Sequence, residues 1–312
     1  MPRLRNPTDL GNSGGSKIEA GGQRAKAWVN ESMNIGLIYN QISWEEKAII
    51  EEAKKQGIEI RPYDSRKMRL KIQDGEEFSE IDLFLQRCLS YTKGLYSTTI
   101  LESQGFRVIN SAECQEICGN KLKTSVALNR FGISTPTTYV TFSFESALKA
   151  LEELGYPAIL KPLIGSWGRL VAILKDEQSA KAILESREVL GSFLHKVYYL
   201  QEFINSGRDI RVFVVGESAV AAMYRYLIPG DWRSNATIGA KADPCEITPE
   251  MEDLALKAAA VTKGEIVGVD FFEKEDQLLV NEVNHAPGFR HIVLATGVNI
   301  AEKIVEYLKT CG

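Results

Sequence analysis

The sequence lacks long apolar runs and an excess of basic residues. No apolar run approaches the roughly 20 residues that a helix needs to cross a bilayer, so we predict no membrane-spanning segment. Lys and Arg together number 37 against 41 Asp and Glu, which gives a formal net charge of −4. Proteins that bind nucleic acid usually carry a basic surface, so this balance predicts no nucleic-acid partner.

Histidine and cysteine are scarce, and this scarcity argues against several kinds of site. The 312 residues include three histidines and five cysteines, and after residue 33 the sequence has no Gly-x-Ser-x-Gly segment of the kind found in serine hydrolases. Cys114 and Cys118 lie four residues apart, but without a second Cys or His pair nearby this spacing does not favour a zinc site. An odd number of cysteines without a disulfide framework predicts reduced thiols and a cytoplasmic protein.

The first 33 residues lack the periodic apolar positions of the rest of the chain. They are rich in Gly, Ser, Asn and charge, which predicts a disordered leader over 1–33, either native or produced by an upstream start. The stretch has no apolar core of the kind found in secretory signals. Its basic residues would suit a transit peptide, but Asp9, Glu19 and Glu31 argue against one.

The remaining sequence predicts an α/β and α+β protein in three parts. Residues 34–118 alternate β-prone runs with helical periods, which is typical of a parallel α/β sheet. Within this part, Ser43 followed by Glu46 predicts the start of a helix. Residues 119–196 contain helices and two antiparallel strands that bracket a glycine-rich loop. Residues 197–312 contain hairpins, a polar loop and two further helices.

The stretch KPLIGSWGRLV, which begins at Lys161, joins two apolar runs through this loop. Gly165 and Gly168 let the backbone approach a ligand closely or take positive φ, and successive N–H groups in such a turn form an anion site. Lys161 and Arg169 add donors that suit phosphate. We interpret Trp167 as a hydrophobic anchor for the loop. The alternative is an ordinary glycine hairpin with solvated charges.

A second polar cluster lies in the segment GVDFFEKEDQLLVNEVN. Glu282 and Asn284 are two residues apart on a predicted strand, so their side chains point to one face. A turn at 274–277 returns the chain and brings Asp270 beside them. Two carboxylates and an amide oxygen suit Mg²⁺, which prefers oxygen ligands. The alternative is a polar sheet face exposed to water, but the apolar residues around these positions favour a metal site.

Together these features resemble the ATP-grasp superfamily, in which ATP lies between two α+β units and a parallel α/β (pre-ATP-grasp) domain precedes them. The resemblance implies that two lysines contact phosphate and adenine, that the glycine loop closes over the phosphates, and that a strand edge holds adenine. The nucleotide residues implied in this way are Lys121, Lys161, Gly165, Ser166, Trp167, Gly168, Arg169, Gln201, Glu202, Phe203 and Asp209. The implied cofactors are ATP and Mg²⁺, the latter on Asp270, Glu282 and Asn284.

Several segments resemble a narrower group, the RimK-like LysX and ArgX ligases of lysine and arginine biosynthesis. The segments are QRCLSYTKGL, CGNKLKTSVAL, KPLIGSWGRL, GRDIRVFVVGE and LLVNEVNH. The resemblance implies that ATP phosphorylates the C-terminal glutamate side chain of a small acidic, zinc-containing carrier protein, LysW. The amine of α-aminoadipate or glutamate then attacks the acyl phosphate. It also implies a homodimer or homotetramer.

The chain departs from this group at three places. Asn120 stands where Asp is common, and Gly288 stands where an acidic residue is common. LysX-like members tend to carry Asn-Ser and ArgX-like members Gly-Phe at the position of His291-Ile292, which matches neither. Because Arg290 is a long, flexible cation that reaches a carboxylate at either depth, we predict that both amino acids are used.

Further residues are assigned to catalysis and to the amino acid. Arg211 and Arg225 fall on a predicted hairpin near the site, and Arg225 is assigned to the substrate carboxylate or the transferring phosphate. A surface salt bridge is the alternative for both. Arg233 and Asn235 are interpreted as part of a lid, with a solvated loop as the alternative. The candidate catalytic residues are Arg225, Asn235 and Arg211, and the candidate substrate residues are Arg225, His285, Arg290, His291 and Ile292.

Two other functions stay open at this point. A RimK-like glutamate ligase could act on a pterin or deazaflavin cofactor or on a ribosomal protein tail, and a non-catalytic module could bind ATP alone. The complete metal set counts against the second alternative. A protein acceptor with acidic character predicts basic residues around the cleft, for which Lys123, Arg130 and Lys196 are candidates. A cofactor acceptor predicts an aromatic pocket instead.

Overall fold

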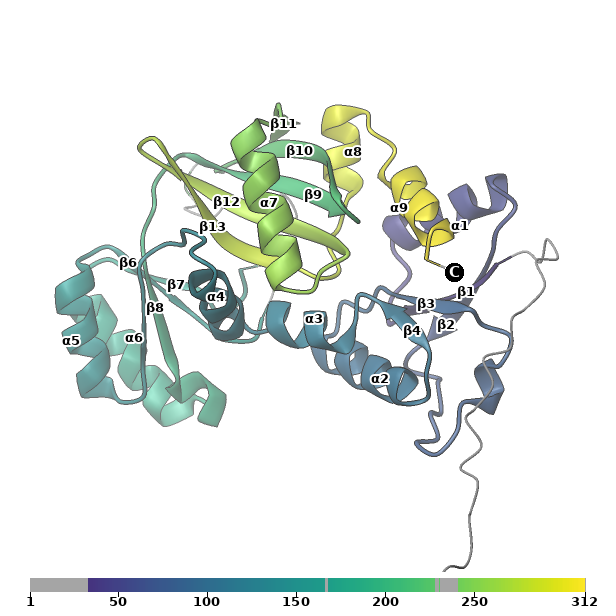
Figure 1. Cartoon of the computed structure of the whole chain (residues 1–312). Helices are drawn as coiled ribbons and strands as arrows, with labels where there is room; N and C mark the ends of the chain where they lie inside the picture. Colours follow the sequence, from purple (N-terminus) through teal and green to yellow (C-terminus); the bar gives the residue numbers. More distant parts are fainter. Residues whose placement is uncertain (1–32, 166–167, 228–229, 231–240, 312) are drawn as a thin grey trace, which may run out of the picture. The chain divides into compact units, whose positions relative to one another are not determined.

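The computed structural model of the chain describes residues 33–165, 168–227, 230 and 241–311. These residues form three sheets, each with its own helices (Figure 1). The predicted combination of α/β and α+β architecture is confirmed. In this described part of the chain, no helix is both long enough and apolar enough to cross a membrane.

The first sheet is parallel, with the strand order β2-β1-β3-β4. Its strands are β1 (Asn34–Tyr39), β2 (Glu59–Asp64), β3 (Leu83–Gln86) and β4 (Arg107–Ile109). Its helices are α1 (Trp44–Lys55), the short η1 (Glu76–Phe78), α2 (Tyr91–Ser103) and α3 (Ala112–Cys118). Helical connections of this kind are what allow neighbouring strands to run parallel. Helix α1 begins at the predicted capping box of Ser43 and Glu46.

The second sheet is antiparallel, with the strand order β5-β8-β6-β7. Its strands are β5 (Thr138–Thr141), β6 (Ala158–Lys161), β7 (Ala172–Leu174) and β8 (Tyr198–Glu202), and its helices are α5 (Phe144–Leu154), α6 (Glu177–Leu190) and the short η2 (Phe193–Lys196). The preceding helix α4 (Lys121–Arg130) packs instead against α3 and against α7 and β13 of the third sheet. Helices α5 and α6 pack side by side on this sheet (Figure 1). The strand β8, which follows the expected boundary at Lys196, pairs with β5 and β6 of this sheet. The apolar pattern of a strand does not reveal which sheet it completes.

The third sheet is antiparallel, with the strand order β11-β10-β9-β12-β13. Its strands are β9 (Arg208–Val215), β10 (Ser218–Tyr226), β11 (Ala242–Pro244), β12 (Ile266–Lys274) and β13 (Gln277–Asn284), and its helices are α7 (Pro249–Val261), α8 (Arg290–Thr296) and α9 (Ile300–Lys309). Alternate residues of β9 belong to different cores: Val212 and Val214 pack with α7, whereas Phe213 and Val215 pack with α8 and α9. The sheet is therefore covered by helices on both faces.

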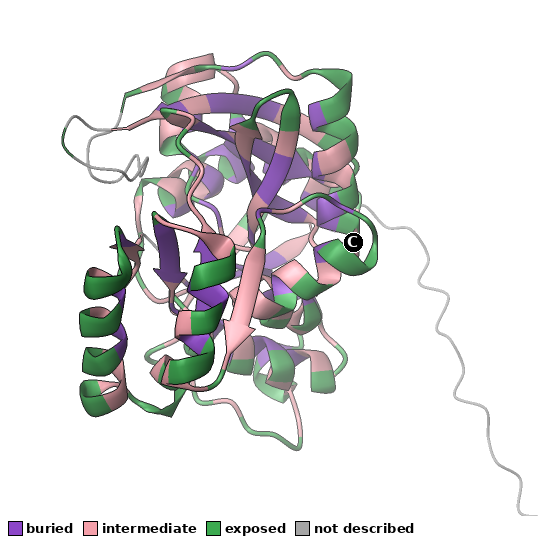
Figure 2. Ribbon diagram, turned by 90° about the vertical axis from the view of Figure 1, so that its left-hand side faces the viewer, coloured by how far each residue is buried: buried purple, intermediate pink, exposed green. Residues whose placement is uncertain are grey.

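The first and third sheets share one hydrophobic core. Residues of β1 such as Ile35 and Leu37 belong to the same buried cluster as Phe213 of β9 and Ile304 of α9. Figure 2 shows the strands largely buried and the outward faces of the helices exposed. This shared core fixes the N-terminal part against the sheet that carries the predicted metal ligands.

Candidate active site

The glycine loop connects β6 to β7, which pair antiparallel as predicted. Gly168 has a φ of +66°, in the left-handed region that side chains disfavour. Lys121, the first residue of α4, donates a hydrogen bond from Nζ to the carbonyl oxygen of Gly165 at 2.9 Å. Ser166 and Trp167 lie outside the described residues, so the anchor role of Trp167 stays a prediction.

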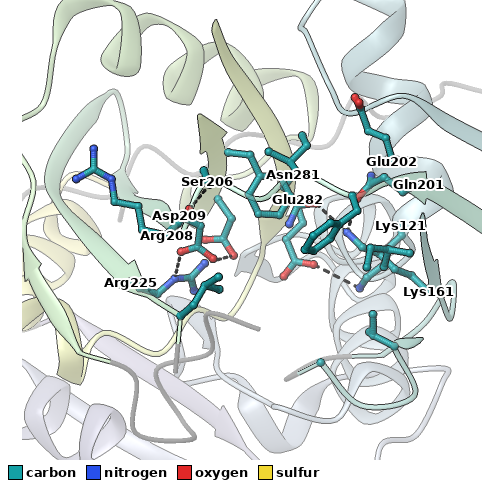
Figure 3. A pocket seen from close by; sticks show the side chains of 18 of the residues that line it. Lys121, Lys161, Gln201, Glu202, Ser206, Arg208, Asp209, Arg225, Asn281 and Glu282 are labelled. Carbon is teal, nitrogen blue, oxygen red and sulfur yellow. Dashed lines mark hydrogen bonds and ion pairs between the residues drawn. The ribbon is translucent and has the colours of Figure 1, made fainter. Parts of the chain in front are cut away.

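One cavity is bordered by the glycine loop, the end of β8 and the strands β12 and β13 (Figure 3). Most of the predicted nucleotide residues meet there. Those that line the cavity are Lys121, Lys161, Gly165, Gly168, Arg169, Gln201, Glu202, Phe203 and Asp209. Arg225, Asp270 and Glu282 line it as well. The same cavity is therefore lined by cations of the kind that bind phosphate and by carboxylates of the kind that bind a metal ion.

Lys161 lies at the end of β6 and points into this cavity (Figure 3). Its Nζ donates to Oε1 of Gln201 at 2.6 Å and to Oδ1 of Asn281 at 2.8 Å. Burial disfavours the charged form and lowers the pKa of Lys161 to about 8. Its ammonium group is therefore held at the cavity wall by two neutral side chains.

Asn281 is a site residue that the sequence reasoning missed. The period of two along a strand would point Asn281 away from the face of Glu282. The pairing of β12 with β13 shifts at this place, because Asp270 pairs with Glu282 whereas the next residue, Phe271, pairs with Val280. Asn281 is the extra residue of this bulge, and a bulge can direct two consecutive side chains toward one site. The sequence offers no local signal for the bulge.

The three predicted metal ligands lie on paired positions of β12 and β13. Asp270 is opposite Glu282, and Asn284 has its Nδ2 at 3.4 Å from Oδ2 of Asp270. Two carboxylates and one amide are oxygen donors of the kind that Mg²⁺ prefers, so these residues fit that ion. Among the described residues, no group of three or more His, Cys, Asp and Glu side chains is arranged for a metal. A metal ion at this place would therefore also need the amide oxygen of Asn284.

Two arginines hold Asp270. Arg211 donates from Nε and Nη2 to the two carboxylate oxygens, each at 2.6 Å, and Nη2 of Arg225 lies 3.1 Å from Oδ2. Burial alone would raise the pKa of Asp270, but Arg211 and Arg225 outweigh it and lower the pKa to about 2. Nε of Arg225 also donates to Asp209 at 2.5 Å. Because the Arg225 side chain is only 6% exposed, the surface salt-bridge alternative is wrong for this residue.

Glu282 faces the first lysine of the site. Its Oε2 lies 3.4 Å from Nζ of Lys121. Burial would raise the pKa of Glu282, but the nearby cation of Lys121 outweighs it and the pKa is lowered. Glu282 is therefore ionised at neutral pH, as a metal ligand must be.

A second cavity lies between the N-terminal part and the third sheet. Its lining includes Arg211, Asn284, His285, Arg290 and His291. It shares four residues with the first cavity, namely Lys121, Gly165, Arg225 and Glu282. The predicted nucleotide and substrate residues thus occupy two adjoining spaces.

The remaining predicted substrate residues differ in their surroundings. Burial, with a smaller contribution from Arg87, lowers the pKa of His285 to about 4, so its imidazole is neutral at neutral pH. Nδ1 of His285 is buried and has no hydrogen-bond partner within the described part of the chain. Ile292 has no exposed surface and belongs to the hydrophobic core, which corrects the expectation that its side chain contacts substrate. Arg233 and Asn235 lie outside the described residues.

Three charged residues of the N-terminal part that were not predicted also line the second cavity, namely Glu45, Glu46 and Arg87. The sequence pattern assigns Glu46 only a capping role in α1, and it gives no sign that Oε1 of Glu46 lies 3.2 Å from Nε of Arg87. The predicted basic candidates Lys123, Arg130 and Lys196 line neither of these two cavities.

The fold of this chain is similar to that of a solved ATP-grasp protein. The crystal structure of a RimK domain ATP-grasp protein from Sphaerobacter thermophilus matches with a TM-score of 0.74 and 25% identity, covering 88% of this chain and 98% of that chain. The fold and the site therefore define an ATP-dependent carboxylate–amine ligase of the ATP-grasp type. A model of the RimK-like ATP-grasp domain matches residues 118–308, and a model of the LysX preATP-grasp domain matches residues 35–117. The chain belongs to the RimK-like ATP-grasp family.

Curated relatives of two kinds are similar over most of the chain. The α-aminoadipate–LysW ligase LysX of Sulfolobus acidocaldarius is 38% identical over 270 residues, which is 85% of this chain and 98% of the relative. The glutamate–LysW ligase ArgX of Sulfurisphaera tokodaii is 35% identical over 279 residues, which is 89% of this chain and 98% of the relative. The resemblance to LysX and ArgX drawn from the motifs is thus confirmed.

Proposed function

We propose that the enzyme joins glutamate and α-aminoadipate to the γ-carboxyl group of the C-terminal glutamate of a LysW-type carrier protein, at the expense of ATP. Its similarity to a LysX and to an ArgX, at 38% and 35% identity, supports a carrier-protein ligase without favouring either amino acid. The match of the LysX preATP-grasp model to residues 35–117 supports a carrier protein over a pterin, a deazaflavin or a ribosomal tail as the acceptor.

The observation that carries this proposal is the junction of the two cavities. Lys121, Gly165, Arg225 and Glu282 line both of them. A ligase that activates a carboxylate with ATP needs the γ-phosphate, the carboxylate and the attacking amine at one point. We assign the nucleotide to the first cavity and the amino acid to the second, so that the two substrates meet at these shared residues.

The residues around the first cavity suit ATP. Lys121 and Lys161 provide cations for phosphate oxygens, the loop around Gly165 and Gly168 covers the phosphates, and residues 201–203 hold adenine at the end of β8. Asp270, Glu282 and Asn284 would hold Mg²⁺, which when bound neutralises charge on the phosphate oxygens. Fixed charges of this kind stabilise the transition state because they need no reorganisation during the reaction.

The residues around the second cavity suit an amino acid with two carboxylates. Arg225, at the junction with the nucleotide cavity, binds the carrier carboxylate that is activated or the phosphoryl group that is transferred, and Arg211 supports it through their shared partner Asp270. Arg290 and His291 line this cavity and would bind the distal carboxylate, and Nδ1 of His285, which has no hydrogen-bond partner among the described residues, is a candidate partner for the substrate amine. We assign no covalent nucleophile to the enzyme.

The partners follow from the same proposal. The acceptor is a small acidic, zinc-containing LysW-type protein, and we expect the enzyme to act as a homodimer or homotetramer in the cytoplasm, where ATP is available.

The test is carrier-dependent ADP release with each amino acid. Glutamate and α-aminoadipate differ by one methylene, which a pocket discriminates by only about 1–3 kcal/mol. We therefore expect activity with both and a kcat/KM ratio below about 100. Activity with only one amino acid contradicts dual use. Activity with neither, in the presence of a competent carrier, favours the cofactor or ribosomal-tail alternative.

A further inference from the structure

The loop 285–289 joins the end of β13 to α8 and forms one wall of the second cavity. Arg290 and His291, the first residues of α8, continue that wall. These two side chains are the proposed partners of the distal carboxylate of the amino acid. The position of the loop and of α8 therefore sets how deep the amino-acid pocket is.

Helix α8 has no capping side chain of its own. Its N-cap residue is Phe289, which makes no side-chain cap hydrogen bond, whereas Ser, Thr, Asp or Asn usually occupies this position. Oε1 of Glu45, in the first turn of α1, instead accepts hydrogen bonds from the N–H groups of Phe289 and Arg290, each at 3.2 Å. The other carboxylate oxygen accepts from the hydroxyl of Ser43 at 2.7 Å. The N-terminal part of the chain thus caps a helix of the substrate wall.

Gly288 leaves room for this carboxylate. A Cβ atom added at Gly288 would lie 3.3 Å from Oε1 of Glu45, which is closer than ordinary van der Waals contact. The φ of Gly288 is outside the left-handed range, so conformational freedom does not account for the glycine. A side chain at this position would therefore displace the carboxylate of Glu45 by a few tenths of an ångström.

A second contact fixes the same loop from the same side. Nη2 of Arg87 donates to the carbonyl oxygen of Pro287 at 3.0 Å, and its guanidinium carbon lies 5.8 Å from the ring centroid of Phe289. Glu46, the neighbour of Glu45, accepts from Nε of Arg87 at 3.2 Å, and the two side chains are 2% and 3% exposed. Two consecutive glutamates of α1 therefore hold the two ends of the segment from Pro287 to Arg290. Glu45 binds the Arg290 end directly, and Glu46 acts on the Pro287 end through Arg87.

We propose that Glu45 is a positioning residue that determines substrate specificity. Its carboxylate holds the loop 285–289 and α8, and it thereby sets the distance from the junction of the two cavities to Arg290 and His291. This inference rests on the proposed function, because it takes the second cavity to be the amino-acid site. Neither Glu45 nor the loop lines the nucleotide cavity. A change at Glu45 should therefore alter amino-acid use and leave ATP use unchanged.

The first experiment compares Glu45→Ala with Glu45→Gln and with Glu51→Ala, a control on the exposed side of the same helix. For Glu45→Ala we expect the KM for the amino acid to rise about tenfold or more, since a hydrogen bond to a charged group contributes that much. The KM for ATP should stay at the wild-type value, and the kcat/KM ratio of the two amino acids should change. Glu45→Gln keeps an acceptor oxygen and should recover part of the effect. Glu51→Ala should behave as wild type.

A second variant protects the test against a simple loss of folding. Gly288→Ala retains the carboxylate of Glu45 but displaces it, so it should raise the KM for the amino acid in the wild-type background. In the Glu45→Ala background, where that carboxylate is absent, the same substitution should have little further effect. Additive effects of the two substitutions, or an unchanged amino-acid KM in Glu45→Ala, would overturn the inference while the proposed function stands. If the wild-type enzyme uses neither amino acid, the proposed function fails and this inference fails with it.

Discussion

Replacement of Asp270 by Asn should remove both catalysis and a large part of the folding stability. The carboxylate of Asp270 is 5% exposed and lies between Arg211 at 2.6 Å and Arg225 at 3.1 Å. Asn has nearly the same shape as Asp but carries no negative charge, so the guanidinium groups of Arg211 and Arg225 lose the carboxylate that they share. Removal of one member of a buried ion pair typically costs about 3–5 kcal/mol. That is a large fraction of the roughly 5–15 kcal/mol by which a domain is stable.

Glu282→Gln is the matched comparison for this prediction. It also removes one carboxylate of the metal face, but Glu282 is 28% exposed and lies 3.4 Å from a single lysine, Lys121. A partly exposed pair of this kind contributes about 1 kcal/mol or less. Both variants should lose ADP formation, and only Asp270→Asn should unfold at a much lower urea concentration.

Urea unfolding followed by circular dichroism, together with an ADP-release assay, provides the measurement. Arg211→Met in the Asp270→Asn background should recover part of the lost stability, because it removes a buried charge that no longer has its partner. The reasoning is refuted if Asp270→Asn unfolds at the same urea concentration as Glu282→Gln. Normal ADP formation in either folded variant would contradict the metal assignment.

Two further predictions concern Lys161. Lys161→Met should weaken ATP binding measured by calorimetry, and an affinity equal to that of wild type would mean that the glycine loop and its lysine are only structural. The pKa of Lys161 is lowered to about 8, so the group is protonated below that pH and loses its charge above it. ATP affinity of the wild type should therefore fall about tenfold between pH 7 and pH 9, if bound phosphate keeps the group protonated. Lys161→Arg should bind ATP with no such pH dependence, since an arginine stays charged throughout.

Local patterns predict those parts of the site that depend on residues close in sequence. Ser43 and Glu46 form the predicted capping box, and β6 and β7 pair on either side of the glycine loop. The spacing of Glu282 and Asn284 on one strand correctly brings them together beside Asp270. Each of these features is set by chain geometry over a few residues, which a single sequence displays.

Other features depend on pairings between distant segments, and the sequence does not display them. The strand β8 completes the second sheet, because its partners are β5 and β6. Asn281 joins the site only through a bulge in the pairing of β12 with β13. Glu45 contacts the backbone of Phe289 across 244 residues of sequence, from a helix whose own pattern is fully explained by its capping box and its buried face.

We propose that this site activates a carboxylate of the carrier as an acyl phosphate before the amine attacks. The direct measurement uses a carrier whose C-terminal side-chain carboxyl group is labelled with heavy oxygen, incubated with the enzyme, ATP and glutamate. The carboxylate oxygen that attacks the γ-phosphorus leaves with the phosphate when the amine attacks the carbonyl carbon. We predict released phosphate that carries one heavy oxygen, and a carrier that gains one glutamate residue and keeps only one of its two heavy oxygens. Unlabelled phosphate, or ADP release without a change in the mass of the carrier, would contradict the account.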